Sequence, residues 1–321
     1  MTATAEKPFV IALEEHYYDP EVAAKGEQGT GGGRNAAMPR LLDLEEMRLE
    51  EMDGAGINIQ VLSHAPSPIQ QLDPDVAIQL ATDTNNRLLK SVQQHPDRFA
   101  GFGALPTSDP KAATAELERV VTQLGFKGAM IHGRTQGKFH DDEQFWPIFE
   151  KAQELDVPIY IHPGPPHPAV AEAYYADYLG RFPGLNSAAW GFTIDTANQA
   201  LRLILSGLFD AFPRLKLILG HLGEGMPFMV DRIDESLNRG VSKIPFKDIF
   251  CEHFYITTSG HFSTPALICS ILELGIDRIL FSVDYPYVES KPGTKWMETV
   301  PLSKEDKEKM FNGNARKLLK M

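Results

Sequence analysis

The chain has 321 residues, of which 43% are hydrophobic, 23% charged and 9% aromatic. These values are those of an ordinary globular protein and argue against a disordered chain, a collagen-like chain or a disulfide scaffold. The 31 Lys and Arg against 43 Asp and Glu give a formal net charge of −12, and a surface of that sign repels nucleic-acid phosphates and anionic lipid headgroups. We therefore expect neither a nucleic acid nor a membrane as a partner.

Cysteine usage and the amino-terminal residues both favour a cytoplasmic protein. Cys251 and Cys269 form neither a CxxC pair nor a disulfide framework, as is usual in a reducing compartment. The opening MTATAEKPF lacks the basic start and apolar centre of a secretory signal, and no stretch approaches the roughly 18 consecutive apolar residues of a membrane span.

Short apolar runs recur along the chain, and each is followed by a longer segment with helical periodicity. Most of these runs are nearly continuous in Val, Ile, Leu, Met, Phe and Ala, which is typical of strands buried on both faces of a parallel sheet. The predicted strands are 9–13, 58–62, 99–104, 127–131, 157–161, 215–219, 253–257 and 278–283.

The segments between the strands carry the start and stop signals of helices. One begins with Ser108 or Asp109 as a cap and Pro110 in the first turn, and ends at Gly125. The predicted helices are 41–56, 73–95, 108–125, 142–155, 186–212, 224–239, 263–274 and 303–319. Eight such β-then-α units without a linker predict one α/β domain over residues 1–321, a single (β/α)8 TIM barrel. A doubly wound open sheet is the alternative.

A glycine-rich segment, KGEQGTGGGRN, lies between the first strand and the first helix. It lacks the GK[ST] ending of a phosphate-binding loop, so we give that match no weight. We interpret residues 20–40 as a mobile loop over the barrel mouth, where it could act as a lid. A flexible insert without function is the alternative.

Polar side chains follow the predicted strands at their carboxyl ends, where barrels of this type carry their active sites. The first strand runs into Glu14 and His16, which point to the same side because side chains alternate along a strand. The fifth, sixth and eighth strands end at His162, at His221 with Glu224, and at Asp284.

Two imidazoles and two carboxylates at one end of a barrel make a site for a divalent cation such as Zn²⁺ or Mn²⁺. Any one of these residues could instead be solvated or cap a loop. Four separate strand ends would then have to carry ligand-type residues by accident, so we favour the metal site.

The strings ALEEH, IHPGPP, LILGHLGEG, ITTSG and RILFSVDYP resemble a known family. It is the amidohydrolase-related family of 2-amino-3-carboxymuconate semialdehyde decarboxylase, and above all its branch of γ-resorcylate, 2,3-dihydroxybenzoate and 5-carboxyvanillate decarboxylases. The resemblance extends from Ile11 to Leu319. The branch depends mainly on Glu14 and His16, because the hydrolases of the family carry His-x-His there.

The resemblance implies one divalent metal ion per subunit, Zn²⁺ or Mn²⁺, held by Glu14, His16, His162 and Asp284. Two neutral imidazoles and two carboxylates leave a divalent ion with roughly zero net charge, so it acidifies water less strongly than a site with three imidazoles. Such a site suits carbon–carbon cleavage better than hydrolysis. Binuclear relatives also need a carboxylated Lys at the end of the fourth strand, where this chain has His132.

The implied reaction is the reversible, non-oxidative decarboxylation of a hydroxybenzoate, a small aromatic carboxylate. Asp284 is the candidate proton donor, and His221 paired with Glu224 would fix a tautomer or relay the proton. The candidate substrate contacts are Arg232, His132, His64 and Tyr17, although each His could equally be a hydrogen-bonded loop residue.

The resemblance further implies a homodimer or homotetramer. Two other functions remain open. A metal-dependent hydrolase of a lactone, amide or ester is possible in the same fold, since fold does not dictate reaction. A non-catalytic metal-binding or interaction protein is the third interpretation, and the intact ligand set argues against it.

Overall fold

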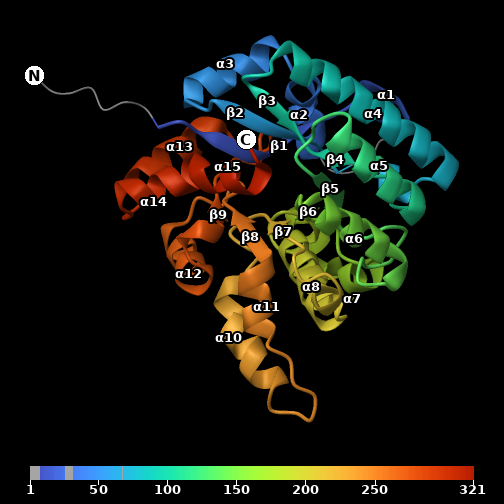
Figure 1. The fold of residues 1–321 in the computed structure, drawn as a ribbon, viewed down its shortest axis with the longest axis vertical. Coiled ribbons are helices and arrows are strands. Elements are labelled where there is room, and N and C mark those ends of the chain that lie inside the picture. Colours follow the sequence, from blue (N-terminus) through green and yellow to red (C-terminus); the bar gives the residue numbers. More distant parts are fainter. Residues whose placement is uncertain (1–7, 26–31, 67) are drawn as a thin grey trace, which may run out of the picture.

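Parallel strands alternate with helices around a common axis in this computed structural model, which describes residues 8–25, 32–66 and 68–321 (Figure 1). The first three strands form one sheet and the next six form another, each in sequence order. The strands are β1 (Ile11–Tyr17), β2 (Ile59–His64), β3 (Phe99–Gly101), β4 (Gly103–Ala104), β5 (Ala129–His132), β6 (Ile159–His162), β7 (Leu217–Leu219), β8 (Phe254–Thr257) and β9 (Ile279–Leu280).

Backbone hydrogen bonds join the two sheets into a closed ring. The Phe102 N–H donates to the Leu62 carbonyl at 2.9 Å, so β3 and β4 are one predicted strand with a break between them. On the other side, the Leu13 N–H donates to the Phe281 carbonyl at 3.3 Å, which joins the end of β9 to β1. Eight strand positions therefore close into a barrel, and the predicted (β/α)8 fold is confirmed.

The helices surround the barrel as in the predicted alternation (Figure 1). The predicted cap of the segment 108–125 is confirmed, since Asp109 Oδ1 accepts a hydrogen bond from the Ala112 N–H at 2.9 Å. The main helices are α3 (Glu46–Ala55), α4 (Pro74–Gln94), α5 (Pro110–Thr122), α6 (Trp146–Leu155), α7 (Pro168–Leu179), α8 (Gly191–Leu205), α10 (Met226–Leu237), α11 (Phe246–His253), α12 (Thr264–Leu274) and α13 (Ser290–Thr299).

One predicted helix is wrong in its continuity. The segment 186–212 is divided into α8 and α9 (Leu208–Ala211) by Gly207, whose φ of +86° lies in the left-handed region. Periodicity alone does not reveal this break, because the apolar residues keep a helical spacing across it. The predicted helix over 303–319 is confirmed, since α14 (Lys304–Glu308), a π-helical turn and α15 (Asn314–Leu319) follow one another without interruption.

The prediction of a loop over residues 20–40 is also wrong in part. The structure forms α1 (Pro20–Lys25) and α2 (Gly32–Leu42) within it. Residues 26–31 lie outside the described residues, so the mobile lid stays a prediction.

Apolar side chains fill the inside of the barrel below the mouth. Those from the strands are fully or almost fully buried, and α15 adds Leu318 and Leu319 from the end of the chain. The strand residues of this inner cluster are Ile11, Leu13, Val61, Ala100, Met130, Tyr160, Ile218 and Leu280. The interior is thus a packed core, and polar chemistry is confined to the strand ends.

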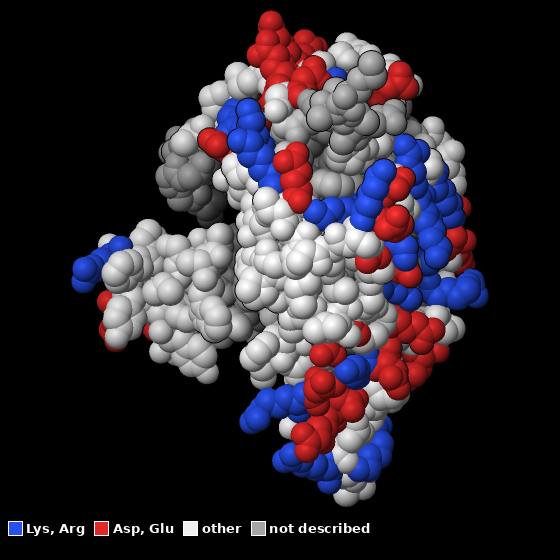
Figure 2. Space-filling view, turned by 90° about the vertical axis from the view of Figure 1, so that its left-hand side faces the viewer, with Lys and Arg blue, Asp and Glu red and all other residues white. Residues whose placement is uncertain are grey.

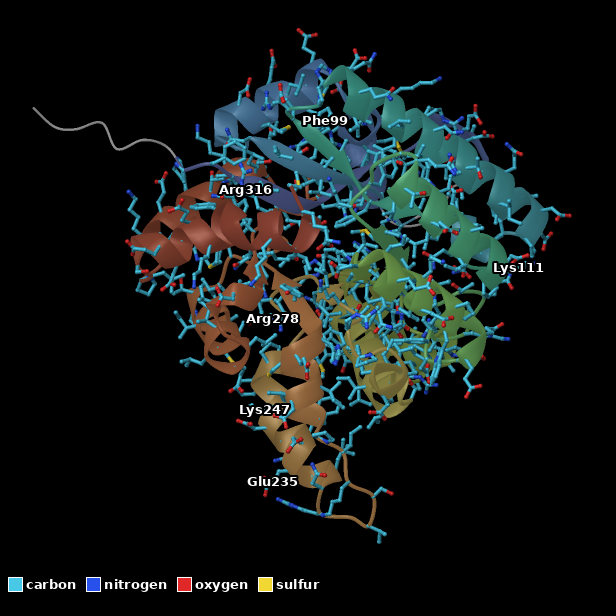
Figure 3. The ribbon with its side chains drawn as sticks, viewed as in Figure 1. Phe99, Lys111, Glu235, Lys247, Arg278 and Arg316 are labelled. Atoms are coloured by element: carbon cyan, nitrogen blue, oxygen red, sulfur yellow. The ribbon has the colours of Figure 1, made fainter. Side chains whose placement is uncertain are left out.

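The helices α10 and α11 project from the barrel as a pair, and Figure 3 shows Glu235 and Lys247 on this arm. Lys247 Nζ lies 2.7 Å from Asp231 Oδ1 and 2.8 Å from Glu273 Oε2, so ion pairs tie the two helices to each other and to α12.

The acidic residues that give the chain its net charge of −12 do not form a single patch on the face shown in Figure 2. Acidic and basic residues alternate along its edges around a broad area without Lys, Arg, Asp or Glu. Among the described helices, none is long and apolar enough to cross a membrane.

Candidate metal centre

Strand ends bring two imidazoles and two carboxylates together at the mouth of the barrel. Glu14 and His16 belong to the carboxyl-terminal half of β1, and His162 ends β6. Asp284 lies four residues beyond β9. One potential ligand atom from each of the four lies within 4.8 Å of every other. Since ligand atoms sit about 2.0–2.2 Å from a bound Zn²⁺ or a similar ion, these four side chains could hold one metal ion.

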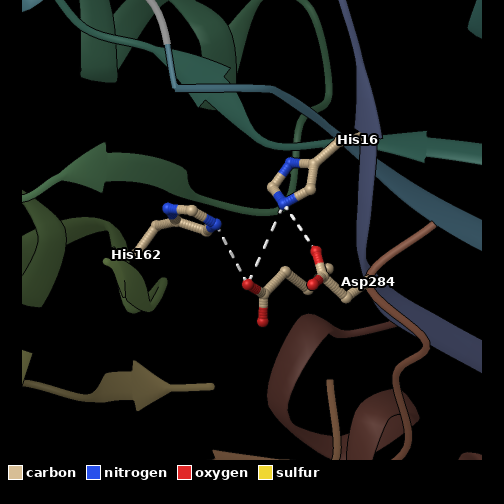
Figure 4. A group of neighbouring side chains, drawn as sticks. His16, His162 and Asp284 are labelled. Carbon is tan, nitrogen blue, oxygen red and sulfur yellow. Dashed lines mark ion pairs between the residues drawn. The ribbon is translucent and has the colours of Figure 1, made fainter. Parts of the chain in front are cut away.

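The side chains of His16, His162 and Asp284 point toward one another in Figure 4. Glu14 Oε1 lies 3.2 Å from His162 Nε2 and 3.8 Å from His16 Nε2. His16 Nε2 in turn lies 3.3 Å from Asp284 Oδ1. All four donor atoms therefore face one small space.

The other nitrogen of each imidazole already has a partner. His162 Nδ1 lies 2.8 Å from the carbonyl of Pro163 and so donates to it, which leaves the Nε2 lone pair free. His16 Nδ1 is 3.2 Å from the Ser63 hydroxyl. By contrast, Glu14 Oε1 and His16 Nε2 are buried without a hydrogen-bond partner among the described residues. Buried polar atoms that lack partners are costly, so their donor set fits a cation.

Electrostatics favour positive charge at this place. Burial alone would raise the pKa of Glu14, but the charge of His221 and the contacts with His16 and His162 outweigh it and hold that pKa well below its usual range. Burial lowers the pKa of His16, yet the two carboxylates Asp284 and Glu14 outweigh burial and raise it to about 9. A site that attracts protons this strongly also attracts a metal cation.

His221 and Glu224 stand beside the four ligand residues on an unusual turn. From His221 to Gly225 every residue has a positive φ, including the non-glycine residues Leu222 and Glu224. Such backbone is sparsely populated and is found at functional sites. The turn places His221 Nδ1 2.7 Å from Glu224 Oε1, while His221 Nε2 lies 3.8 Å from Asp284 Oδ2.

His221 and Asp284 are the part of the site that water reaches. Their side chains are 25% and 16% exposed, whereas Glu14 and His16 are fully buried. Burial lowers the pKa of His221, but Glu224, Glu14 and Asp284 outweigh it and raise the pKa well above the ordinary value. These carboxylates thus favour the protonated form of His221, whose partly exposed ring is open to exchange with solvent.

The structure places His132 beside the four residues that could bind the metal ion. Its ring lies 4.8 Å from the ring of His162, and its Nδ1 is 3.3 Å from Gln70 Oε1. Burial lowers the pKa of His132, and the charges of His162, His16 and His64 lower it further. The neutral ring has a buried Nε2 without a hydrogen-bond partner among the described residues, so it is able to accept a hydrogen bond from a ligand.

Tyr17 and His64 lie together at the ends of β1 and β2, and His64 lines the same small cavity as His132. His64 Nε2 accepts a hydrogen bond from the Asp19 N–H at 3.0 Å, and its Nδ1 is 2.6 Å from the Ala65 carbonyl. The Tyr17 ring lies 5.2 Å from the His64 ring. Both ring nitrogens of His64 are thus hydrogen-bonded, but the residue ends β2 and does not lie in a loop. The roles of His64 and Tyr17 as substrate contacts stay predictions.

Arg232 is not brought to the ligand cluster within this chain. It is exposed on α10, part of the arm that projects from the barrel (Figure 1). Its role as a substrate contact stays a prediction.

Several residues that the sequence did not single out surround Glu14. Tyr160 and Ser259 both donate hydrogen bonds to Glu14 Oε2, and Thr257 contacts both hydroxyls. One signal was present for Tyr160, which stands two residues before His162 on the same strand and so points to the same side. Ser and Thr are too common near strand ends to be recognised individually.

Comparison with known proteins gives consistent results. A family model described as amidohydrolase matches residues 34–321. γ-Resorcylate decarboxylase of Rhizobium radiobacter is 41% identical over 326 residues, which cover 97% of this chain and 98% of that protein. The crystal structure of a 2,6-dihydroxybenzoate decarboxylase in complex with 2,6-dihydroxybenzoate has a TM-score of 0.90 and 40% identity, and the match covers 98% of this chain and 100% of that one.

A dihydroxybenzoic acid decarboxylase from Polaromonas sp. JS666, solved with bound manganese and the inhibitor 2-nitroresorcinol, has the same TM-score and identity. That match covers 98% of this chain and 97% of the other.

Proposed function

Because this chain belongs to the amidohydrolase family, we propose that it is a metal-dependent, non-oxidative decarboxylase of a hydroxybenzoate. The observation that carries the proposal is the buried cluster of Glu14, His16, His162 and Asp284 at the barrel mouth. It stands in a chain that is similar along nearly its whole length to proteins named as decarboxylases of this substrate class.

A divalent cation held by these four residues would supply Lewis acidity and positive charge at the barrel mouth. Mn²⁺ is the ion to test first, since a similar structure contains bound manganese. Two carboxylates with two imidazoles suit Zn²⁺ as well, so the activity with Zn²⁺ is to be compared with the activity with Mn²⁺.

The residues of the chain itself move the proton. Asp284 delivers a proton to the ring carbon that bears the carboxylate, the bond from that carbon to the carboxylate breaks, and its electrons restore the aromatic ring as CO₂ leaves. His221 returns a proton from solvent to Asp284 by way of one bridging water, since its Nε2 lies 3.8 Å from Asp284 Oδ2. Glu224 holds His221 in place through its Nδ1.

The proposed substrate is an ortho-hydroxybenzoate, with 2,6-dihydroxybenzoate as the first compound to test. The similar proteins are named for this compound, which is γ-resorcylate under another name. Near the metal site, the Nε2 of His132 has no hydrogen-bond partner in the described part of the chain and is suited to accept a hydrogen bond from a ring hydroxyl.

The proposal is tested by measuring products from the Mn²⁺-loaded protein with 2,6-dihydroxybenzoate, 2,3-dihydroxybenzoate, salicylate, an aryl ester and a lactone. We expect CO₂ and the corresponding phenol from at least one hydroxybenzoate. Acid released only from the ester or lactone, with no CO₂ from any phenolic acid, would replace the decarboxylase by the hydrolase.

The role of Asp284 is tested in the same assay with Asp284→Asn, which keeps the size of the side chain and an oxygen ligand. Turnover should fall on the order of 10²- to 10⁴-fold while at least part of the metal is retained, since a proton donor is lost. Asp277→Asn is the matched control, because Asp277 pairs with Lys309 at the surface. Turnover per bound metal ion that is unchanged in Asp284→Asn would exclude Asp284 as the donor.

A cytoplasmic location and a homodimer or homotetramer complete the proposal. Large aromatic side chains are exposed after β6, which supports burial against a second subunit: Tyr174, Tyr178, Phe182 and Trp190 are 48–73% exposed. Light scattering after size-exclusion chromatography tests the oligomer, and a mass of one chain would refute it.

A further inference from the structure

We propose that the side chains of Tyr160, Thr257 and Ser259 form a hydroxyl cluster whose hydrogen bonds engage one oxygen of Glu14. Only the other oxygen of Glu14 would then be available to bind the metal ion. The inference rests on the metal site of the proposed function and does not depend on which substrate is used. It assigns positioning roles to residues that neither contact the four ligand atoms of the site nor carry the proton.

The hydroxyl cluster converges on one atom. The Tyr160 hydroxyl from β6 and the Ser259 hydroxyl beyond β8 both donate to Glu14 Oε2. Thr257 Oγ1 lies 2.7 Å from the Tyr160 oxygen and 2.5 Å from Ser259 Oγ. Each hydroxyl has one proton, and Tyr160 and Ser259 give theirs to Glu14. Thr257 must therefore donate to one of them, and all three protons are directed toward the carboxylate.

The second oxygen of Glu14 has the opposite surroundings. Oε1 has no hydrogen-bond partner among the described residues and faces His162 Nε2 at 3.2 Å. Bulk solvent does not reach this oxygen, because Glu14 is fully buried. One oxygen of the carboxylate thus accepts two hydrogen bonds, and the other accepts none from the described residues. This difference orients Glu14 toward the ion before the ion binds.

The backbone leaves space for this arrangement at Gly220, directly after β7. A Cβ atom built at Gly220 would lie 2.7 Å from Glu14 Oε2 and 3.2 Å from the Tyr160 hydroxyl oxygen. Real Cβ atoms do not approach other atoms as closely as 2.7 Å. A side chain at position 220 would therefore displace the carboxylate or the Tyr160 hydroxyl.

The hydroxyl cluster also matches a carboxylate better than an imidazole at position 14. A carboxylate oxygen can accept two hydrogen bonds at once, whereas an imidazole nitrogen accepts one. With His at this position, one of the two buried hydroxyl donors would lose its acceptor, which is unfavourable. The cluster thus helps to explain physically why this barrel carries Glu14 rather than a third His.

The inference is tested by measuring Mn²⁺ affinity of the metal-stripped protein by competition with a chelator, without substrate. Tyr160→Phe and Ser259→Ala each remove one donor and should weaken binding on the order of 10- to 100-fold, as for other groups that orient metal ligands. Tyr255→Phe is the matched control, since Tyr255 is half-buried on β8 and its ring packs on Arg278. The control should leave the affinity unchanged within a factor of two.

Two substitutions at Thr257 separate the effect of its hydroxyl group from the effect of its side-chain shape. Thr257→Val should weaken Mn²⁺ binding and alter the electron paramagnetic resonance spectrum of the bound Mn²⁺, whereas Thr257→Ser should leave both as in the wild type.

Substitution of Gly220 tests the space beside Glu14. Gly220→Ala should weaken Mn²⁺ binding although all three hydroxyls are present, and Gly54→Ala, where a Cβ meets no atom within 4 Å, should not. If Tyr160→Phe does not fold, the Ser259, Thr257 and Gly220 variants decide the outcome.

Unchanged Mn²⁺ affinity and spectrum in folded Tyr160→Phe, Ser259→Ala and Thr257→Val would overturn the inference. Equal losses in Tyr255→Phe would also overturn it, because the effect would then be general. A wild-type protein that binds Mn²⁺ tightly but releases no CO₂ would refute the proposed function and leave this inference standing.

Discussion

Glu14 sets the charge balance of the metal centre. Together with Asp284 it offsets the two positive charges of a divalent ion, while His16 and His162 add none when neutral. An ion in such a shell acidifies bound water less than one held by three imidazoles. The residue thus favours release of CO₂ over attack by water, and this is the chemical basis for preferring a decarboxylase.

His140, a buried histidine outside the metal centre, makes stability depend on pH. The side-chain nitrogen of Gln199 donates to His140 Nδ1 at 2.6 Å, and His140 Nε2 donates to Thr135 Oγ1 at 2.9 Å. A proton on Nδ1 would face the Gln199 donor. Burial accordingly lowers the pKa of His140 to about 3.

The direction of the pH effect follows from linkage. The folded-state pKa lies below the ordinary value of 6.5, so the unfolded chain takes up the proton first and stability is lost as the pH falls below about 6.5. We expect His140→Gln to remove this loss, which is at most about 1.4 kcal/mol per pH unit. The measurement is urea unfolding of both metal-free proteins at pH 7.5 and 5. A difference between the two proteins that is the same at both pH values would contradict the assignment.

At the scale of single residues, the sequence predicts what strand ends and alternation determine. Strand ends and alternation indicated a group of polar candidates, the family resemblance implied Glu14, His16, His162 and Asp284 as the ligands among them, and the structure brings these four together. The contacts of Tyr160 and Ser259 were not predictable, because they depend on the register between strands that are distant in sequence.

At the scale of elements, two glycines allow the neighbouring strands β5 and β6 to place His132 and His162 side by side. A Cβ at Gly164 would lie 2.7 Å from the Cα of Gly133, whose φ is +48°. Gly133 directly follows His132 at the end of β5, and Gly164 stands two residues after His162 at the end of β6. The close approach explains why this chain has glycine in the loop after His162.

We expect Gly164→Ala to push these two strand ends apart. Mn²⁺ affinity should fall about 10-fold because His162 moves, and the free energy of unfolding should fall by about 1–3 kcal/mol because of overpacking. Gly180→Ala is the control, since a Cβ there meets no atom within 4 Å. Unaltered metal affinity in Gly164→Ala would show that His162 is positioned independently of this contact.

Much of the element order was predictable because apolar strands and amphipathic helices differ in period. The interruptions were not. Gly207 divides one predicted helix, and α1 and α2 form within a segment whose glycines indicated a loop. At Gly207 the local preference of glycine outweighs the helical period, whereas in α1 and α2 the fold outweighs the local preference of the residues.

At the scale of the whole molecule, ion pairs hold the end of the chain to the base of the barrel. Asp156 Oδ1 lies 2.5 Å from Lys216 Nζ, and its Oδ2 lies 2.7 Å from Lys320 Nζ, beyond α15. Hydrogen bonds from the two lysines lower the pKa of Asp156. Three segments that are distant in sequence therefore meet at one carboxylate.

We expect Asp156→Asn to lower the free energy of unfolding at pH 7 by no more than about 1 kcal/mol, since the groups are partly exposed and screened by salt. Asn tolerates the left-handed backbone at this position, where φ is 52°, so only the charge changes. Because the folded-state pKa is lowered, the stabilisation should be present above about pH 4 and should vanish as the pH falls through and below that value. Denaturant curves at pH 7 and pH 3.5 measure this, and a larger effect at the lower pH would contradict it.

The most direct test of the central claim is a titration of the metal-free protein with Mn²⁺ while CO₂ release from 2,6-dihydroxybenzoate is recorded. One metal site built from Glu14, His16, His162 and Asp284 predicts no release without metal, a linear rise with added ion and a plateau at one Mn²⁺ per chain. Release that persists in the metal-free protein, or a plateau at two ions per chain, would contradict the account.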